Sequence, residues 1–235
     1  KYLEEKNILL NGLTKNCVLL LSPSQYQAKE KNNKKHSNAS RFFNIKKMIS
    51  RFGLTAFKNN LEFLASDTVN SLHYIASLAS LGTVITWLNK KHWNFYAVDC
   101  YDYGLLYFMK KTQQLTKRML IVRQWDEVIY CLLVIDGIPM KAESTSVYGA
   151  YDAKQSADET LADKLLYYFH DVAQEELQVM VLGNIPLAAS KLPEKWQTTT
   201  INTQGFMENI DANKHDMDLA IWLPLIGCGL YHAKD

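Results

Sequence analysis

Glycine is scarce in this chain, at 10 of 235 residues, and the glycines that are present do not form a phosphate-binding loop. Such a loop needs glycine because a Cβ would keep the backbone N–H groups away from the phosphate oxygens. The sequence contains neither a P-loop nor the Gly-x-Ser-x-Gly turn that carries the nucleophile of many serine hydrolases. These absences argue against a P-loop NTPase and against nucleophilic catalysis by serine.

Cysteine is also scarce. The cysteines lie far apart in the sequence and include no Cys-x-x-Cys pair; they are Cys17, Cys100, Cys131 and Cys228. The six histidines lack the close spacing of a zinc motif. We therefore expect no disulfide framework and no metal site, and we interpret the cysteines as buried, reduced thiols of a cytosolic protein.

Surplus charge and long apolar runs are missing too. The net charge is +2, so overall charge predicts neither a nucleic-acid partner nor a membrane partner. The longest apolar runs, such as Tyr130–Ile135, have the length of strands and fall well short of the roughly 18 residues of a membrane span. The chain begins at Lys1 without a signal-peptide pattern. A strand upstream of Lys1 would not be included in this sequence, so we leave open whether the first half of the fold is complete.

Residues 95–231 carry an ordered series of strand and helix patterns. The expected elements are a strand at Phe95–Val98, a helix at Tyr101–Lys111, strands at Met119–Val122, Val128–Ile135 and Ile138–Ser144, a helix at Ser156–Glu175, a strand at Val179–Leu182, a short helix, a strand at Thr198–Ile201 and a helix at Asp216–Tyr231. Asp136-Gly137 predicts a tight hairpin turn. A β-meander followed by helix, strand and helix is the order found in half of a ribonuclease-H-like or actin-like domain. The sequence therefore predicts an α/β fold of that class.

Residues 1–94 carry a second, less regular series of patterns. The expected elements are a helix at Tyr2–Leu13, a strand at Cys17–Leu21, a segment at Gln25–Ala28 that extends or pairs the same sheet, a polar loop at Lys29–Ser40, a helix at Arg41–Phe52, strands at Leu61–Ala65 and Leu72–Ser77, and a helix at Thr83–Lys91. We predict two halves: residues 1–97 with a small inserted basic subdomain, and residues 98–235.

The turn between the first two strands of the meander carries phosphate-approaching Asp and Gly residues in ATPases of this fold. Here the turn is expected at Arg123–Glu127, which contains a tryptophan and two carboxylates but no glycine. Arg123 and Asp126 are the candidate phosphate or Mg²⁺ contacts in a degenerate site. We favour the simpler interpretation, in which Arg123 is a solvated turn arginine and the two acids are ordinary turn residues.

Asp99 and Asp102 lie where a predicted strand meets a predicted helix, a place where catalytic acids often occur. Acids at a helix start also complement the helix dipole and cap free N–H groups. We favour the capping interpretation.

The stretch Lys29–Arg51 is the one local charge asymmetry, and Lys34, Lys35, Lys46 and Lys47 are its candidate contacts to a partner or membrane. Lysines in such a stretch can bind anionic lipid headgroups or nucleic acid. We favour a solvated loop and helix face over either role.

Several segments, taken in their order, resemble the PilM-type actin-like proteins of type IV pilus assembly, and especially their MshI- and HofM-type relatives in the mannose-sensitive (MSHA) pilus. The segments are Cys17–Gln27 (CVLLLSPSQYQ), Tyr96–Leu106 (YAVDCYDYGLL), Val128–Thr145, Ala157–His170, Met180–Asn184 and Leu219–Leu230. The resemblance implies an actin-like ATPase fold in which Met180–Asn184 stands at the adenosine loop. Only Gly183, followed by Asn184, remains of that loop's glycines.

The resemblance implies a non-catalytic scaffold at the cytoplasmic face of the inner membrane. Its expected partner is a PilN-like single-span protein, whose short cytoplasmic peptide would enter a groove between subdomains. No cofactor and no nucleic acid are expected. Three alternatives stay open: an enzyme of the ATPase or sugar-kinase type that binds ATP and Mg²⁺, a competence protein for DNA uptake, and a component of a related secretion system.

Overall fold

The computed structural model describes residues 16–30, 60–64, 72–77, 86–87, 90, 94–146, 157–183, 185, 187–199, 201 and 219–232. The helices predicted over residues 2–13 and 41–52 lie outside these residues. The helix predicted over residues 83–91 is described only at positions 86, 87 and 90, which are helical.

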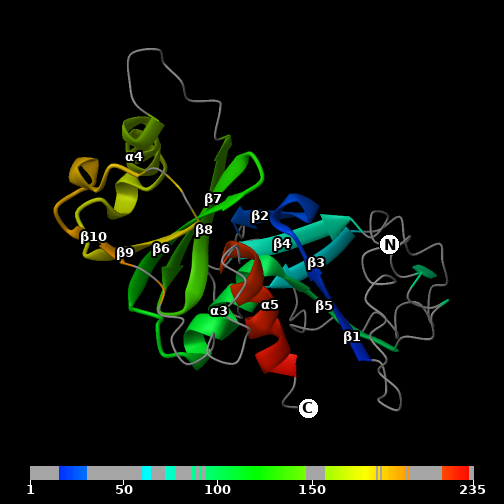
Figure 1. Ribbon diagram of the computed structural model, residues 1–235. Helices are drawn as coiled ribbons and strands as arrows, with labels where there is room; N and C mark the ends of the chain where they lie inside the picture. Colours follow the sequence, from blue (N-terminus) through cyan, green and yellow to red (C-terminus); the bar gives the residue numbers. More distant parts are fainter. Residues whose placement is uncertain are drawn as a thin grey trace, which may run out of the picture.

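The largest sheet in the described part of the chain has five strands (Figure 1). They are β6 (Arg118–Trp125), β7 (Val128–Ile135), β8 (Ile138–Ser146), β9 (Leu177–Leu182) and β10 (Trp196–Thr199), in the order β10-β9-β6-β7-β8. Strands β6, β7 and β8 form an antiparallel meander, and β9 and β10 continue the sheet parallel to β6. This topology is that of a ribonuclease-H-like domain, so the prediction for residues 95–231 is confirmed.

The meander is closed by tight turns with left-handed backbone. Asp136 and Gly137 have φ values of 51° and 76°, which is the conformation that a two-residue hairpin turn requires. The turn between β6 and β7 consists of Asp126 and Glu127 alone, and Asp126 has a φ of 56°. The β6 strand therefore runs to Trp125, and Arg123 belongs to the strand rather than to the turn predicted at 123–127.

Alternate residues of the sheet face two separate layers. On one face, apolar residues of β6, β7 and β9 pack with α4 (Ala157–Tyr168) in a cluster that includes Leu120, Val122, Leu133, Leu161, Leu165 and Phe169. On the other face, Met119, Ile121, Leu132 and Val134 pack with α3 (Tyr101–Lys111) and α5 (Leu219–His232). Figure 1 shows α3 and α5 side by side, on the opposite side of the sheet from α4.

Glycines allow α3 and α5 to pack closely. A Cβ on Gly227 would lie 1.8 Å from the carbonyl oxygen of Gly104, and a Cβ on Gly104 would lie 2.3 Å from the carbonyl oxygen of Pro224. Neither approach is tolerated by a real side chain, so the crossing requires glycine at both positions. Helix α5 accommodates Pro224 within its span.

The first part of the chain contributes two smaller groups of strands. Strand β1 (Asn16–Leu21) pairs parallel with β5 (Asn94–Cys100), which leads directly into α3. Strands β2 (Tyr26–Glu30), β4 (Leu72–Ser77) and β3 (Asn60–Leu64) form an antiparallel sheet in that order. The expectation that residues 25–28 extend the sheet of β1 is wrong. A 3-10 turn, η1 (Pro23–Gln25), redirects the chain after Ser22, and β2 pairs with β4 instead.

The helix predicted over residues 156–175 is too long. Helix α4 ends at Tyr168, and a separate 3-10 turn, η3 (His170–Val172), follows because Phe169 leaves the helical conformation, at φ −117° and ψ 31°. After another 3-10 turn, η4 (Ala189–Lys191), β10 begins at Trp196, two residues earlier than predicted.

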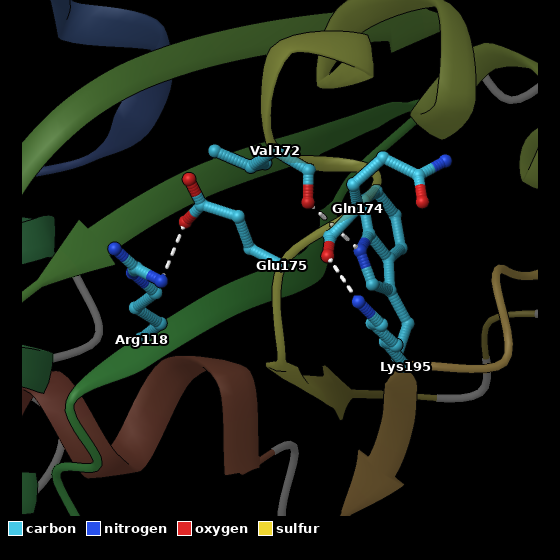
Figure 2. Close-up of polar contacts among 6 residues, drawn as sticks. Arg118, Val172, Gln174, Glu175 and Lys195 are labelled. Carbon is cyan, nitrogen blue, oxygen red and sulfur yellow. Dashed lines mark hydrogen bonds and ion pairs between the residues drawn. The ribbon is translucent and has the colours of Figure 1, made fainter.

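Polar contacts fasten this connection to the sheet (Figure 2). They are the ion pair of Arg118 with Glu175 at 2.7 Å, the Lys195 ammonium donating to the Gln174 carbonyl at 2.9 Å, and the Trp196 indole N–H donating to the Val172 carbonyl at 3.4 Å. The segment from Val172 to Glu175, at and after the end of η3, is thus held against the starts of β6 and β10.

None of the helices in the described ranges combines the length and apolarity that crossing a bilayer requires.

Candidate functional site

Three chain segments converge where parallel strands end. The carboxyl ends of β1 and β5 lie together, since Leu21 is in register with Cys100. In the larger sheet, Arg123 near the end of β6 is in register with Leu182 at the end of β9. In open α/β sheets, ligands bind outside the carboxyl ends of the strands. The residues at these ends are therefore the first place to look for a site.

The segments meet at a buried ion pair. The Nη2 atom of Arg123 contacts the Asp102 carboxylate, and it also donates to the Tyr26 hydroxyl at 3.2 Å. The Arg123 and Asp102 side chains are only 4% and 5% exposed. Tyr26 begins β2, Asp102 lies in the first turn of α3, and Arg123 lies in β6, so the group links both parts of the fold.

These contacts overturn two interpretations made from the sequence. Arg123 is buried rather than solvated, because in β6 it continues the inward-facing row of Met119 and Ile121. Asp102 does not act as a capping residue, because α3 has no side-chain cap and the carboxylate pairs with Arg123. Asp99 does accept a local hydrogen bond, at 2.9 Å from the Cys100 backbone N–H.

Aromatic rings complete the surroundings of the guanidinium. Tyr130 stands opposite Arg123 in the β6–β7 register, and its ring centre lies 5.9 Å from the guanidinium carbon. The Tyr101 ring centre lies 5.1 Å from the same carbon. Both distances lie within the range of cation–π attraction. The ring of Tyr74 packs edge-on against that of Tyr26 at 5.4 Å.

The electrostatics of the group favour a permanently charged arginine. Burial lowers the pKa of Arg123, but the Asp102 carboxylate and Tyr26 raise it by more, so this pKa lies above its ordinary value. Burial, and then the Asp102 charge, raise the pKa of Tyr26 well above its usual range. The Tyr26 hydroxyl therefore stays protonated, and the Arg123 guanidinium stays ionised, through the physiological pH range.

A pocket of about 340 Å³ adjoins this group. It lies between η1 and β2 on one side and the β7–β8 hairpin on the other, with Asp102 and Arg123 among its walls. The remaining lining residues are Pro23, Tyr26, Gln27, Ala28, Tyr130, Cys131, Leu132, Ala142, Glu143 and Ser144. The Nη1 atom of Arg123 is buried and has no hydrogen-bond acceptor among the described residues. The buried Asp102–Arg123 pair thus forms part of the pocket wall.

The structure brings together only some of the residues predicted to bind a nucleotide. Arg123 and Gly183 lie at the ends of neighbouring strands, and Gly183 has a φ of 97° with open space where a Cβ would stand. Asp126 and Glu127 are exposed and form the hairpin turn between β6 and β7. Asn184 lies outside the described residues.

The arrangement does not fit a magnesium triphosphate. The Arg123 charge is already neutralised by Asp102, and the adjacent turn has no glycine whose N–H groups could approach phosphate. Within the ranges that the structure describes, no three His, Cys, Asp or Glu side chains gather closely enough to hold a metal ion. The described residues of this site thus provide no glycine-lined cradle for a phosphate group.

The other residues singled out from the sequence have different outcomes. The thiols of Cys100, Cys131 and Cys228 are free and buried, as predicted. The four candidate lysines at positions 34, 35, 46 and 47 lie outside the described residues. Tyr26 and Tyr130 were missed as site residues. Tyr130 occupies an inward-facing position of β7 next to Leu132, a period-two signal that could have identified it.

Comparison with known proteins gives structural relatives only. No known protein family and no curated protein sequence matches the chain. The chain resembles a solved structure of a PilM-PilN type IV pilus biogenesis complex with a TM-score of 0.52 and 11% identity, over 91% of this chain and 80% of that one.

Two further structures are similar with lower scores. One is a Bacteroides thetaiotaomicron protein of unknown function with an actin-like ATPase fold, at a TM-score of 0.42 and 12% identity, over 79% of this chain and 68% of that one. The other is the cytoplasmic domain of EpsL, an inner-membrane component of the Vibrio cholerae type II secretion system, at a TM-score of 0.46 and 12% identity, over 91% and 74%. The strand order and the PilM likeness together give this chain an actin-like, ribonuclease-H-like α/β fold.

Proposed function

We propose that this protein is a non-catalytic scaffold of an inner-membrane assembly complex that builds a type IV pilus of the MSHA kind. The observation that carries the proposal is the Asp102–Arg123–Tyr26 group. It fills the junction between the carboxyl ends of the two parallel strand pairs with the protein's own side chains. Docking a partner needs a stable shape at this junction and no phosphate chemistry.

The fold-level likeness to PilM supports the choice of complex and partner. The solved relative is a complex of PilM with PilN. By analogy, the partner is a PilN-like single-span inner-membrane protein, and the scaffold lies in the cytoplasm against that membrane. The cytoplasmic peptide of this partner would dock between the first and second halves of the scaffold. We retain residue 97 as the approximate boundary between the halves. A basic contact to anionic lipid through the lysines at 34, 35, 46 and 47 remains part of the proposal.

The test has two arms. Affinity capture from membranes of the native host is expected to recover a small single-span protein with a short cytoplasmic tail. Isothermal titration with Mg-ATP is expected to give no measurable binding. Tight, magnesium-dependent ATP binding would instead favour an enzyme. Recovery of no such membrane protein by a folded sample would remove the support for the scaffold.

One observation favours the enzyme as a second candidate. Gly183 has left-handed backbone and open space around it at the end of β9, where an adenosine loop would stand. Its substitution by Ala would therefore reduce ATP binding in an enzyme and leave a scaffold's capture of its membrane partner unchanged.

A further inference from the structure

Helix α5 packs against α3 on one side (Figure 1) and exposes an apolar face on the other. Ile221, Trp222 and Leu225 are 36%, 44% and 44% exposed. Gly229 is exposed as well, and nothing lies within 4 Å of the position where its Cβ would stand. At about 3.6 residues per turn these four positions share one face, and Gly227, which meets α3, lies on the opposite one. Large apolar side chains gathered on one exposed face indicate a contact surface.

The charge of the helix limits what can cover this face. None of the residues 219–232 is Asp, Glu, Lys or Arg. Helices that lie on membranes attract anionic headgroups with Lys and Arg beside their apolar face, and α5 provides neither. A two-fold contact between copies opposes residues near the axis to themselves, so a charge there would repel its own copy. An uncharged apolar face therefore fits a second copy of this chain better than a membrane surface.

The order of large and small residues along the face is self-complementary. Ile221, Leu225 and Gly229 follow one another at intervals of four residues, so they form a single ridge of the helix. In an antiparallel pair with its two-fold axis at Leu225, Ile221 of each copy lies over Gly229 of the other. The open space at Gly229 admits the Ile221 side chain.

We propose that α5 is a self-association surface, on which two copies of this chain pair antiparallel through Ile221, Leu225 and Gly229, with Trp222 at the flank of the contact. Two helices of 14 residues bury less than the ~800 Å² per partner of a standard interface, so the pairing is weak and depends on concentration. The pairing does not rest on the proposed docking function. It would give a scaffold two partner sites in one unit.

Sedimentation velocity of the full chain between about 10 μM and 1 mM tests the pairing. The wild type is expected to shift from monomer toward dimer across this range. Leu225→Glu and, separately, Leu225→Lys are expected to weaken the association at least about tenfold, because like charges then meet at the axis. Tyr167→Glu, which changes a residue of α4 that is 77% exposed, is the control and leaves the shift unchanged. A wild type that stays monomeric throughout, or an equal loss in the control, would overturn the proposal.

Two further samples distinguish a two-fold contact from general apolar adhesion, with folding checked by circular dichroism. An equimolar mixture of Leu225→Glu and Leu225→Lys is expected to associate at least about tenfold more tightly than either variant alone, because opposite charges then meet across the axis. Gly229→Leu adds apolar surface and favours the helix, but it fills the space that faces Ile221, so it is expected to weaken the pairing at least about tenfold. No gain in the mixture, or tighter association of Gly229→Leu, would overturn the proposal.

Vesicles and partner capture separate the other occupants of this face. A wild type that stays monomeric but sediments with vesicles of phosphatidylcholine and phosphatidylglycerol would assign the face to lipid and overturn the pairing. A monomeric wild type that captures the membrane partner, and loses it on Leu225→Glu, would assign the face to that partner, so the pairing fails and the scaffold function stands. A wild type that dimerises through α5 but recovers no membrane partner supports the pairing and leaves the scaffold function without support.

Discussion

At the scale of single residues, the Asp102–Arg123 pair decides how this molecule is interpreted. Removing two charges from water is expensive, and their attraction repays that cost only when both partners are present. Removing one partner of the pair is therefore expected to cost more stability than replacing both by apolar residues.

Arg123→Met is expected to lower the free energy of unfolding by about 3–5 kcal/mol, because it leaves the Asp102 carboxylate buried and unpaired. The double variant with Asp102→Leu is expected to recover at least half of that loss. Urea denaturation measures both. The Arg118–Glu175 pair, whose side chains are about one-third exposed (37% and 35%), serves as the control, since Glu175→Gln is expected to cost less than about 1 kcal/mol. Equal losses in the single and double variants would contradict this account.

The buried thiol of Cys131 is expected to make the free energy of unfolding fall as the pH rises above about 9. Burial, and then Glu143, raise the pKa of its thiol from 9.0 to about 12. A raised folded-state pKa stabilises the fold fully below pH 9, and that contribution is lost as the pH rises from 9 to 12. The free energy of unfolding is therefore expected to fall by up to about 1.4 kcal/mol per pH unit from this thiol. Denaturation between pH 8.5 and 10.5 should show a shallower fall in Cys131→Ala, and identical slopes would refute the assignment.

The sequence was a good guide to the turn acids and a poor one to Arg123. Asp126 and Glu127 are polar residues between apolar runs, which is a local signal. The burial of Arg123 depends on β6 continuing three residues beyond its predicted end at Val122, and on a partner at position 102. An ion pair between residues far apart in the sequence, such as Asp102 and Arg123, cannot be recognised from the local periodicity of apolar residues.

At the scale of elements, prediction succeeded where neighbours in sequence decide the structure. The bounds predicted for α3, β4 and β7 agree with those observed. Prediction failed where a distant segment decides. Strand β2 found its partner in β4, beyond residue 70, and α4 ended early where the chain turns back toward the sheet.

The α3–α5 crossing provides a matched pair of glycines. Gly227→Ala would place a methyl group 1.8 Å from the Gly104 carbonyl oxygen, so we expect a loss of about 1–3 kcal/mol in the free energy of unfolding. Gly229 lies in the same helix with nothing within 4 Å of its Cβ position. Gly229→Ala is therefore expected to be neutral or to stabilise by up to about 1 kcal/mol. Thermal denaturation of the two variants gives the comparison, and similar effects at both sites would argue against a close crossing.

At the scale of the whole molecule, the sheet of β2, β4 and β3 contacts the larger sheet near β8, and the Tyr26–Arg123 hydrogen bond joins the two. The order of elements was enough to predict the actin-like class. It was not enough to predict how the first part of the chain folds against the second, because that depends on side chains meeting across the junction.

Tyr26→Phe tests this junction. Losing the hydroxyl removes one acceptor from Arg123 and is expected to cost about 1 kcal/mol in stability. Because the lost contact joins two sheets, hydrogen exchange at the backbone amides of β2 should accelerate more than exchange in β9. Mass spectrometry of peptides covering the two strands gives the comparison. Uniform acceleration would mean that the two parts open together.

The buried ion pair also constrains how the sequence can change over time. If Arg123 is replaced first, the Asp102 carboxylate is left buried without a partner. If Asp102 is replaced first, the Arg123 guanidinium is left in the same position. Either intermediate is therefore expected to be less stable. Positions 102 and 123 are therefore expected to be exchanged together among homologues, as a charged couple or as two apolar residues. A set of homologues in which the two positions vary independently would show that the couple is dispensable.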